Sequence, residues 1–219
     1  MLFIAEPKSA STSLHELIYD EMKREGWFYC VSSSYGYEKK KIQKLIEALF
    51  KKNLPLSNFI NEKALNLPIY RILEPHGMRN ETLKLLQLLT RSKSIVKAHL
   101  PPTKPNIEKL RRTGAKICIL LRDPFKAYES QLRYMKDLKI TGPDQENPKL
   151  LRAFKHFYNG WRKYESDPNF LIVHFEDLTK DVLTADREIR RVLTHYGFKK
   201  LAPPEELYLL GKKNQSKAS

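Results

Sequence analysis

The fold follows from one stretch, residues 116–124, which reads Lys116-Ile117-Cys118-Ile119-Leu120-Leu121-Arg122-Asp123-Pro124. Its near-continuous apolar run is typical of a parallel strand that is covered on both faces. Arg122 and Asp123 end the run, and Pro124 then favours the start of a helix, which we expect from about 125 to 138. The stretch therefore predicts a buried strand, a polar turn and a helix in succession.

The same succession continues on both sides of this stretch. Short apolar runs predict further strands at 2–5, 28–31, 94–98 and 170–175. Helical spacing of apolar residues predicts helices at about 11–25, 39–52, 81–91, 107–113, 150–165 and 184–196. The alternation predicts an α/β fold, a three-layer domain with a mostly parallel central sheet flanked by helices. We expect a single domain over residues 1–219, with a basic tail from about 207 and a possible substrate cover at 53–78.

Composition limits the class of protein. The chain has 219 residues, 41% of them hydrophobic and 30% charged, which indicates a globular domain. No apolar run approaches the roughly 20 residues of a transmembrane helix, and the N-terminus lacks the basic start of a signal peptide, so we expect a cytoplasmic protein. Cys30 and Cys118 are expected to be reduced core thiols.

The net charge of +15 indicates an anionic partner. A nucleic acid, an anionic membrane surface, an acidic glycan and a nucleotide all satisfy it, and the charge alone does not choose among them.

Polar residues follow three of the predicted strands, where a parallel sheet binds its ligands. Lys8 to Ser13 follow the first strand, His99 directly follows the strand that carries Lys97, and Arg122 follows the strand at 116–121. Because the carboxyl ends of parallel strands share one edge, we expect these residues to form one site.

The turn after the first strand, called here the first turn, reads Lys8-Ser9-Ala10-Ser11-Thr12-Ser13. Small residues let the backbone approach a phosphate, the hydroxyls and the lysine add donors and charge, and the following helix adds its positive end. The turn lacks the glycines and the final Lys-Ser/Thr pair of an ATP-binding P-loop. A plain serine-rich helix cap with a surface lysine is the alternative.

Four segments, in order along the chain, resemble the sulfotransferases that use 3′-phosphoadenosine 5′-phosphosulfate. They are Pro7–Thr12, Lys97–Pro101, Leu121–Pro124 with Ser130 eight positions after Arg122, and His174–Leu178. The resemblance covers the chain from Pro7 to about Phe198. It implies a P-loop-like sulfotransferase fold and in-line transfer of a sulfuryl group to an acceptor hydroxyl or amine.

The resemblance also implies roles for individual residues. His99 is the general base, and an ordinary histidine pKa near 6.5 suits that role at neutral pH. Lys8 neutralises charge on the leaving 5′-phosphate, which Ser9, Ala10, Ser11, Thr12 and Ser13 hold. Lys97 supports the sulfuryl group or that phosphate. Arg122 and Ser130 bind the 3′-phosphate, and no metal is required.

The sequence departs from the family pattern at several positions. Ala10 replaces a loop glycine, Ser13 stands where a tryptophan often stacks on adenine, and Phe175 stands where a tyrosine is common. The C-terminal Arg-Lys-Gly element has only Lys212 and Lys213, after Gly211, as a weak counterpart. These positions bear on cofactor affinity.

Other interpretations stay open from the sequence. The chain fits an inactive relative, a binding module for nucleotides or anionic polymers, or a nucleotide-dependent phosphotransferase. His99 fits a histidine packed at a strand end, Arg122 a partner of Asp123 or Glu129, and the aromatic residues at 154–164 a core. The acceptor is expected to be a small molecule or a glycan, and the basic charge favours an anionic one, with no specific nucleic acid as partner.

Overall fold

The structure is a computed structural model that describes residues 1–5, 14, 18, 28–31, 87, 94–137 and 147–198. The first turn, the helix expected at 39–52, the segment at 53–78 and the basic tail lie outside the described residues. In the described part of the chain, no helix is both long and apolar enough to cross a membrane.

Five strands form one sheet: β1 Leu2–Ala5, β2 Phe28–Val31, β3 Ser94–Ala98, β4 Ile117–Leu121 and β5 Phe170–His174. Their order is β2-β3-β1-β4-β5, and each neighbouring pair is parallel. The predicted parallel sheet is therefore confirmed. The strand order reverses at β1, and such a reversal opens a crevice for ligands at the carboxyl ends of the strands.

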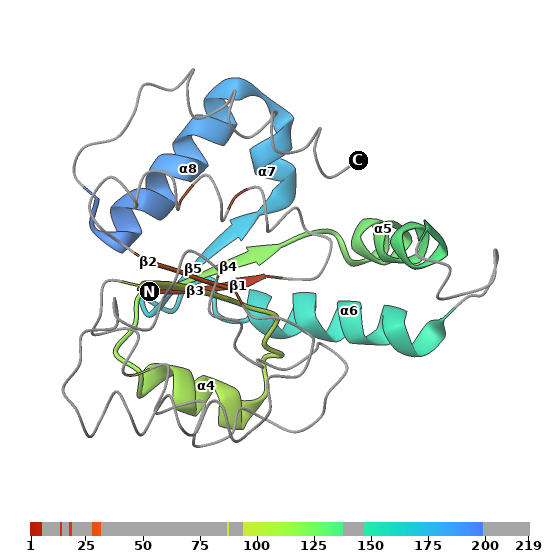
Figure 1. The fold of residues 1–219 in the computed structure, drawn as a ribbon, viewed down its shortest axis with the longest axis horizontal. Coiled ribbons are helices and arrows are strands. Elements are labelled where there is room, and N and C mark those ends of the chain that lie inside the picture. Colours follow the sequence, from red (N-terminus) through yellow and green to blue (C-terminus); the bar gives the residue numbers. More distant parts are fainter. Residues whose placement is uncertain are drawn as a thin grey trace.

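The helices described over their whole length are α4 Lys104–Arg111, α5 Pro124–Asp137, α6 Pro148–Arg162, α7 Phe175–Lys180 and α8 Val182–Tyr196. Figure 1 shows α7 and α8 on one face of the sheet and α4 and α6 on the other. Helix α5 packs beside α6, beyond the carboxyl end of β4 (Figure 1). The predicted three-layer α/β architecture is confirmed.

Several element boundaries differ from the prediction, including those of α4 and of the last strand. Helix α4 begins at Lys104 rather than 107, because the Thr103 hydroxyl accepts the Asn106 N–H at 3.4 Å and a proline occupies the first turn. It ends at Arg111, ahead of a turn that includes Gly114 with φ 67°. The last strand ends at His174, and the short helix α7, which the sequence did not predict, begins at Phe175.

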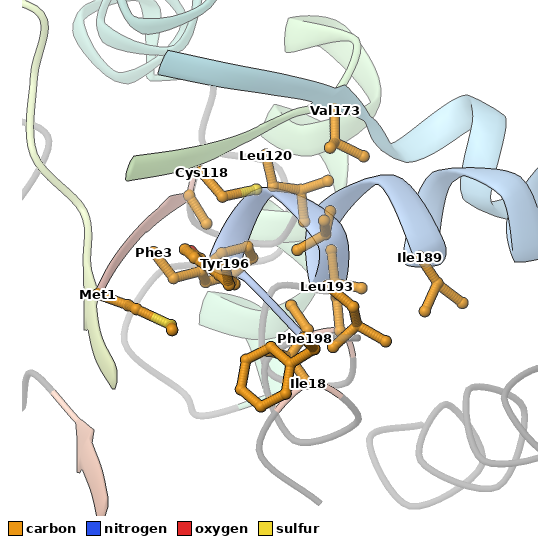
Figure 2. Packing of buried hydrophobic residues seen from close by; sticks show 13 residues of the cluster. Met1, Phe3, Ile18, Cys118, Leu120, Val173, Ile189, Leu193, Tyr196 and Phe198 are labelled. Atoms are coloured by element: carbon orange, nitrogen blue, oxygen red, sulfur yellow. The ribbon is translucent and has the colours of Figure 1, made fainter. Parts of the chain in front are cut away.

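The main core lies between the sheet and α8 (Figure 2). Alternate strand residues face it, with Phe3 from β1 and both Cys118 and Leu120 from β4. The Tyr196 hydroxyl at the end of α8 donates to the Leu2 carbonyl at 2.9 Å, which satisfies its polar atom inside the core. Cys118 is a free, buried cysteine, as predicted, and burial raises the pKa of its thiol.

The opposite face of the sheet is covered partly by α6. Three of its aromatic side chains, Phe154, Phe157 and Trp161, are fully buried. The prediction that aromatic residues of this helix form core is confirmed for these three.

Candidate active site

The end of β3 places two predicted site residues on the carboxyl edge of the sheet. Lys97 is the penultimate strand residue and its side chain is buried, while His99 directly follows the strand. The register pairs Ile4 of β1 with Ala98 of β3, so His99 lies beside Ala5. Ala5 lies three positions before Lys8 in the sequence, so His99 contacts the strand that leads into the predicted anion site.

A hydrogen bond fixes the His99 ring in one tautomer. Its Nδ1 lies 2.7 Å from the Ala5 carbonyl oxygen. A carbonyl oxygen only accepts, so Nδ1 must carry the hydrogen and donate it. The Nε2 atom of the neutral ring is then left with its lone pair, and it is the atom that can take a proton.

The environment of His99 shifts its titration. Burial lowers its pKa to about 4, the nearby Lys97 charge acts in the same direction, and the hydrogen bond to Ala5 only partly opposes them. The ordinary value near 6.5 expected from the sequence is therefore wrong for this site. At neutral pH the ring is fully deprotonated at Nε2, as a general base requires, although a lower pKa makes it a weaker base.

The segment after His99 is held by the core beneath it. The Trp161 indole N–H donates to the Leu100 carbonyl at 3.0 Å, and the buried Asn106 amide donates to the Pro101 carbonyl at 2.8 Å. Gly160 of α6 approaches so closely that an added Cβ would lie 2.3 Å from Cγ of Pro102. These contacts fix the backbone that carries His99.

The second described part of the site is the turn between β4 and α5. Arg122 follows the strand, and Asp123 caps the helix that begins at Pro124. One carboxylate oxygen of Asp123 accepts the N–H groups of Phe125 at 3.1 Å and Lys126 at 3.0 Å. Ser130 lies half-buried on the second turn of this helix.

Residues from the start of α7 reach across to this turn. The Arg122 guanidinium carbon lies 4.5 Å from the centre of the Phe175 ring. The Asp123 backbone N–H donates to the Glu176 carboxylate at 2.9 Å. Sequence reasoning treated Phe175 only as a lost hydroxyl and gave Glu176 no role. The available signal was the Phe175-Glu176 pair at the carboxyl end of the strand predicted at 170–175.

The strand order brings these parts to one edge. Strand β1 lies between β3 and β4, with Ala5 opposite Leu120. The end of β1 is therefore flanked by His99 on one side and by the Arg122 turn on the other. The structure places Lys97, His99, Arg122 and Ser130, whereas Lys8 to Ser13, Lys212 and Lys213 lie outside the described residues.

Metal binding has no new candidate in the described part of the chain. Within it, no group of three or more His, Cys, Asp or Glu side chains is arranged to hold an ion. That the chemistry needs no metal stays a prediction.

Comparison with known families identifies the chain. The family model described as the sulfotransferase domain matches residues 1–209. The chain belongs to the sulfotransferase family. This match spans the four segments on which the sequence resemblance depends. A search of curated proteins found no match.

Three solved sulfotransferase-related structures are similar to this chain. Retinol dehydratase, in complex with androsterone and the inactive cofactor PAP, is 20% identical with a TM-score of 0.53, over 97% of this chain and 63% of its own. Mouse sulfotransferase SULT7A1, complexed with PAP, is 16% identical with a TM-score of 0.58, over 98% and 63%. A sulfotransferase from Alicyclobacillus acidocaldarius is 12% identical with a TM-score of 0.52, over 98% and 92%.

These likenesses support the P-loop-like sulfotransferase fold. The chain spans 63% of the length of the first two structures. The androsterone and PAP bound in these structures are therefore ligands of those proteins, and they do not by themselves identify the donor and acceptor of this sulfotransferase.

Proposed function

We propose that this sulfotransferase moves a sulfuryl group from 3′-phosphoadenosine 5′-phosphosulfate to a hydroxyl or amine of an acceptor. The observation that carries the proposal is the anchoring of His99 to the Ala5 carbonyl at 2.7 Å. This contact joins the predicted base to the strand that leads into the predicted phosphate-binding turn. Family membership and the PAP complexes of two similar structures support the choice of donor.

His99 acts as the general base through Nε2. The acceptor oxygen attacks sulfur as its proton moves to Nε2, and the bond between sulfur and the bridging phosphate oxygen breaks. The products are the sulfated acceptor, 3′-phosphoadenosine 5′-phosphate and a protonated His99. Because the protonated ring is disfavoured where burial lowers its pKa to about 4, the proton passes on readily to solvent.

Two lysines would stabilise the charge that develops during transfer. Lys97 has a buried side chain at the end of β3, two residues before His99, and supports the sulfuryl group or the 5′-phosphate. Lys8, which lies outside the described residues, neutralises charge on the leaving phosphate. The small and hydroxyl residues from Ser9 to Ser13 bind that phosphate.

Arg122 would bind the 3′-phosphate, with Ser130 as a second donor. The planar guanidinium suits bidentate contact with phosphate oxygens. Arg122 lies at the end of β4, on the other side of β1 from His99, so the 3′-phosphate and the transferred group would lie on opposite sides of the first strand. The two ends of the donor would thus be bound separately.

The acceptor class follows from charge rather than from a defined contact. Among the exposed side chains on α5 and α6, the basic ones outnumber the acidic ones: Lys126, Arg133, Lys136, Lys149, Arg152 and Arg162 stand against Glu129 and Asp137. A small molecule or a glycan with negative charge fits this surface better than a cationic one.

The direct test compares nucleotides and then removes the base. Thermal unfolding is followed with 3′-phosphoadenosine 5′-phosphate, ADP, ATP and adenosine 5′-phosphate. We expect the largest rise in Tm with the first, because only it carries both recognised phosphates. Sulfate transfer from the donor to a panel of phenols, alcohols and glycans is then compared for wild type and His99→Asn.

The His99→Asn variant removes the proposed base but can keep the hydrogen bond to Ala5. Its side-chain amide can still donate to the Ala5 carbonyl, but it offers no basic nitrogen. We expect turnover to fall by about 100-fold or more while nucleotide binding stays near wild type. Full turnover of His99→Asn would remove the base assignment, and a Tm that rises equally with all four nucleotides would remove the donor assignment.

A further inference from the structure

The turn that carries Arg122 is clasped by the start of α7, 53 residues later in the chain. The clasp consists of two side chains, Phe175 and Glu176. Phe175 packs its ring against the Arg122 guanidinium, and Glu176 accepts a hydrogen bond from the Asp123 backbone N–H. Both contacts come from the junction of β5 and α7, which lies beside the junction of β4 and α5 because the two strands pair in register from Ile117 to Leu121.

We propose that Phe175 and Glu176 are positioning residues that set the direction of the Arg122 guanidinium toward the 3′-phosphate. The proposal rests on the 3′-phosphate role of Arg122 given above. Neither side chain is assigned a contact with the donor. They act through Arg122 and the backbone at Asp123.

The Phe175 contact constrains the plane of the arginine. A cation 4.5 Å from a ring centre is within the range of cation–π attraction, and the face of the ring fixes where the guanidinium can lie. Phe175 also packs on the main core, so the ring itself is held. The Phe175 ring can therefore restrain the Arg122 guanidinium although it carries no hydroxyl.

The Glu176 contact constrains the backbone. Its carboxylate accepts the Asp123 N–H at 2.9 Å, one residue after Arg122. A hydrogen bond to an ionised acceptor is among the stronger kinds. Asp123 also caps α5, so one bond from Glu176 ties the arginine turn, the helix start and α7 together.

A long, flexible side chain loses rotamer freedom when it binds phosphate, and this loss reduces affinity. If α7 already restricts Arg122, part of that loss is avoided before the nucleotide arrives. The clasp should therefore affect affinity for the 3′-phosphate and leave the contribution of the 5′-phosphate unchanged.

The experiment measures Kd for 3′-phosphoadenosine 5′-phosphate and for adenosine 5′-phosphate, and takes their ratio. The ratio isolates the 3′-phosphate from any general loss of fold. The variants are Arg122→Ala, Phe175→Leu, Phe175→Tyr, Glu176→Ala and Glu176→Gln.

We expect Phe175→Leu to reduce the preference for the bisphosphate by about 2- to 30-fold, the range that a cation–π contact supports. Phe175→Tyr keeps the ring and should retain the preference. Glu176→Ala should reduce it several-fold, whereas Glu176→Gln keeps an acceptor oxygen for the Asp123 N–H and should largely retain it.

The chain offers a matched control. Lys155 lies 4.4 Å from the centre of the Phe125 ring, a similar contact on the exposed side of α5 and α6. Phe125→Leu removes that contact and should leave the preference unchanged. If Phe175→Leu does not fold, Phe175→Met supplies the second apolar replacement, and the Glu176 pair tests the other half of the clasp.

The outcomes separate this inference from the proposed function. If Arg122→Ala removes the preference while Phe175→Leu and Glu176→Ala both keep it, the clasp is overturned and the role of Arg122 stands. If Arg122→Ala itself keeps the preference, the 3′-phosphate role falls and the clasp with it. Loss in the Leu and Ala variants, with retention in the Tyr and Gln variants, supports the clasp.

Discussion

The two described turns at the carboxyl edge of the sheet are held in different ways. The segment after β3, which carries His99, is fixed through its backbone carbonyls by buried partners such as Trp161 and Asn106. The turn after β4, which carries Arg122, is fixed by half-buried side chains from Phe175 and Glu176. One turn depends on fully buried partners, and the other depends on half-buried polar and aromatic side chains.

The difference matches the tasks proposed for the two residues. A general base needs a fixed tautomer and a site that keeps it neutral; the hydrogen bond to Ala5 supplies the first and burial supplies the second. A phosphate-binding arginine keeps its charge in any environment and needs a fixed guanidinium plane, which the contact with the Phe175 ring restrains. Substitutions of the residues that hold the segment after β3 should therefore reduce stability, and those around the turn after β4 should reduce binding.

The largest expected effect of a substitution beneath His99 is at Gly160. In Gly160→Ala the new Cβ would lie 2.3 Å from Cγ of Pro102, so α6 or the segment after His99 must shift. Overpacking of this kind costs roughly 1–3 kcal/mol of unfolding free energy, against the slight gain expected of alanine in a helix. Chemical denaturation measures the loss, and sulfate transfer should fall as well because His99 moves.

Asn159 provides the control for Gly160. It is exposed on the same helix, so Asn159→Ala should be neutral or slightly stabilising. If Gly160→Ala were as stable as Asn159→Ala, the close approach of α6 to Pro102 would not support the His99 segment.

Within the described residues, the sequence predicted the five strands and four of the five helices, because apolar runs and turns are local signals. The run at 117–121 and the polar residues after it placed Arg122 at the carboxyl edge correctly. Helix α7 was missed because Phe175 extends the apolar strand pattern by one residue, although the chain already turns there.

Contacts that depend on strand order were beyond local signals. The pKa of His99 follows from burial by segments far away in the chain, and its bond to Ala5 joins residues 94 positions apart. The contact of Arg122 with Phe175 likewise requires that β4 and β5 be neighbours. Only the assembled sheet shows these relations.

The next largest expected effect is a difference between wild type and His99→Asn in how stability depends on pH. His99 has a pKa near 4 in the folded protein and near 6.5 in the unfolded chain, so the unfolded chain binds its proton first as the pH falls. Its contribution to stability is complete above about pH 6.5 and is lost between pH 6.5 and 4. Between pH 7.5 and 5 we expect wild type to lose up to about 2 kcal/mol more than His99→Asn, which has no titrating group at 99.

Urea denaturation at both pH values measures this difference. Taking the difference between the two proteins cancels other titrating groups, including His195, whose pKa is also lowered by burial. Parallel pH dependence of wild type and His99→Asn would mean that the ring is not buried in its neutral form.

The smallest expected effect tests the other turn. Asp123→Ala removes the cap that accepts the Phe125 and Lys126 N–H groups, at a cost of about 1 kcal/mol of unfolding free energy. Asp181 caps α8 in the same way, accepting the Thr184 N–H at 2.8 Å, so Asp181→Ala should cost a similar amount.

Only Asp123→Ala loosens the backbone next to Arg122. We therefore expect Asp123→Ala alone to weaken binding of 3′-phosphoadenosine 5′-phosphate, as measured by calorimetry, with Asp123→Asn retaining both stability and binding. Equal binding by the Asp123→Ala and Asp181→Ala variants would show that the turn after β4 keeps its shape without the cap, and the contrast between the two turns would then depend on α7 alone.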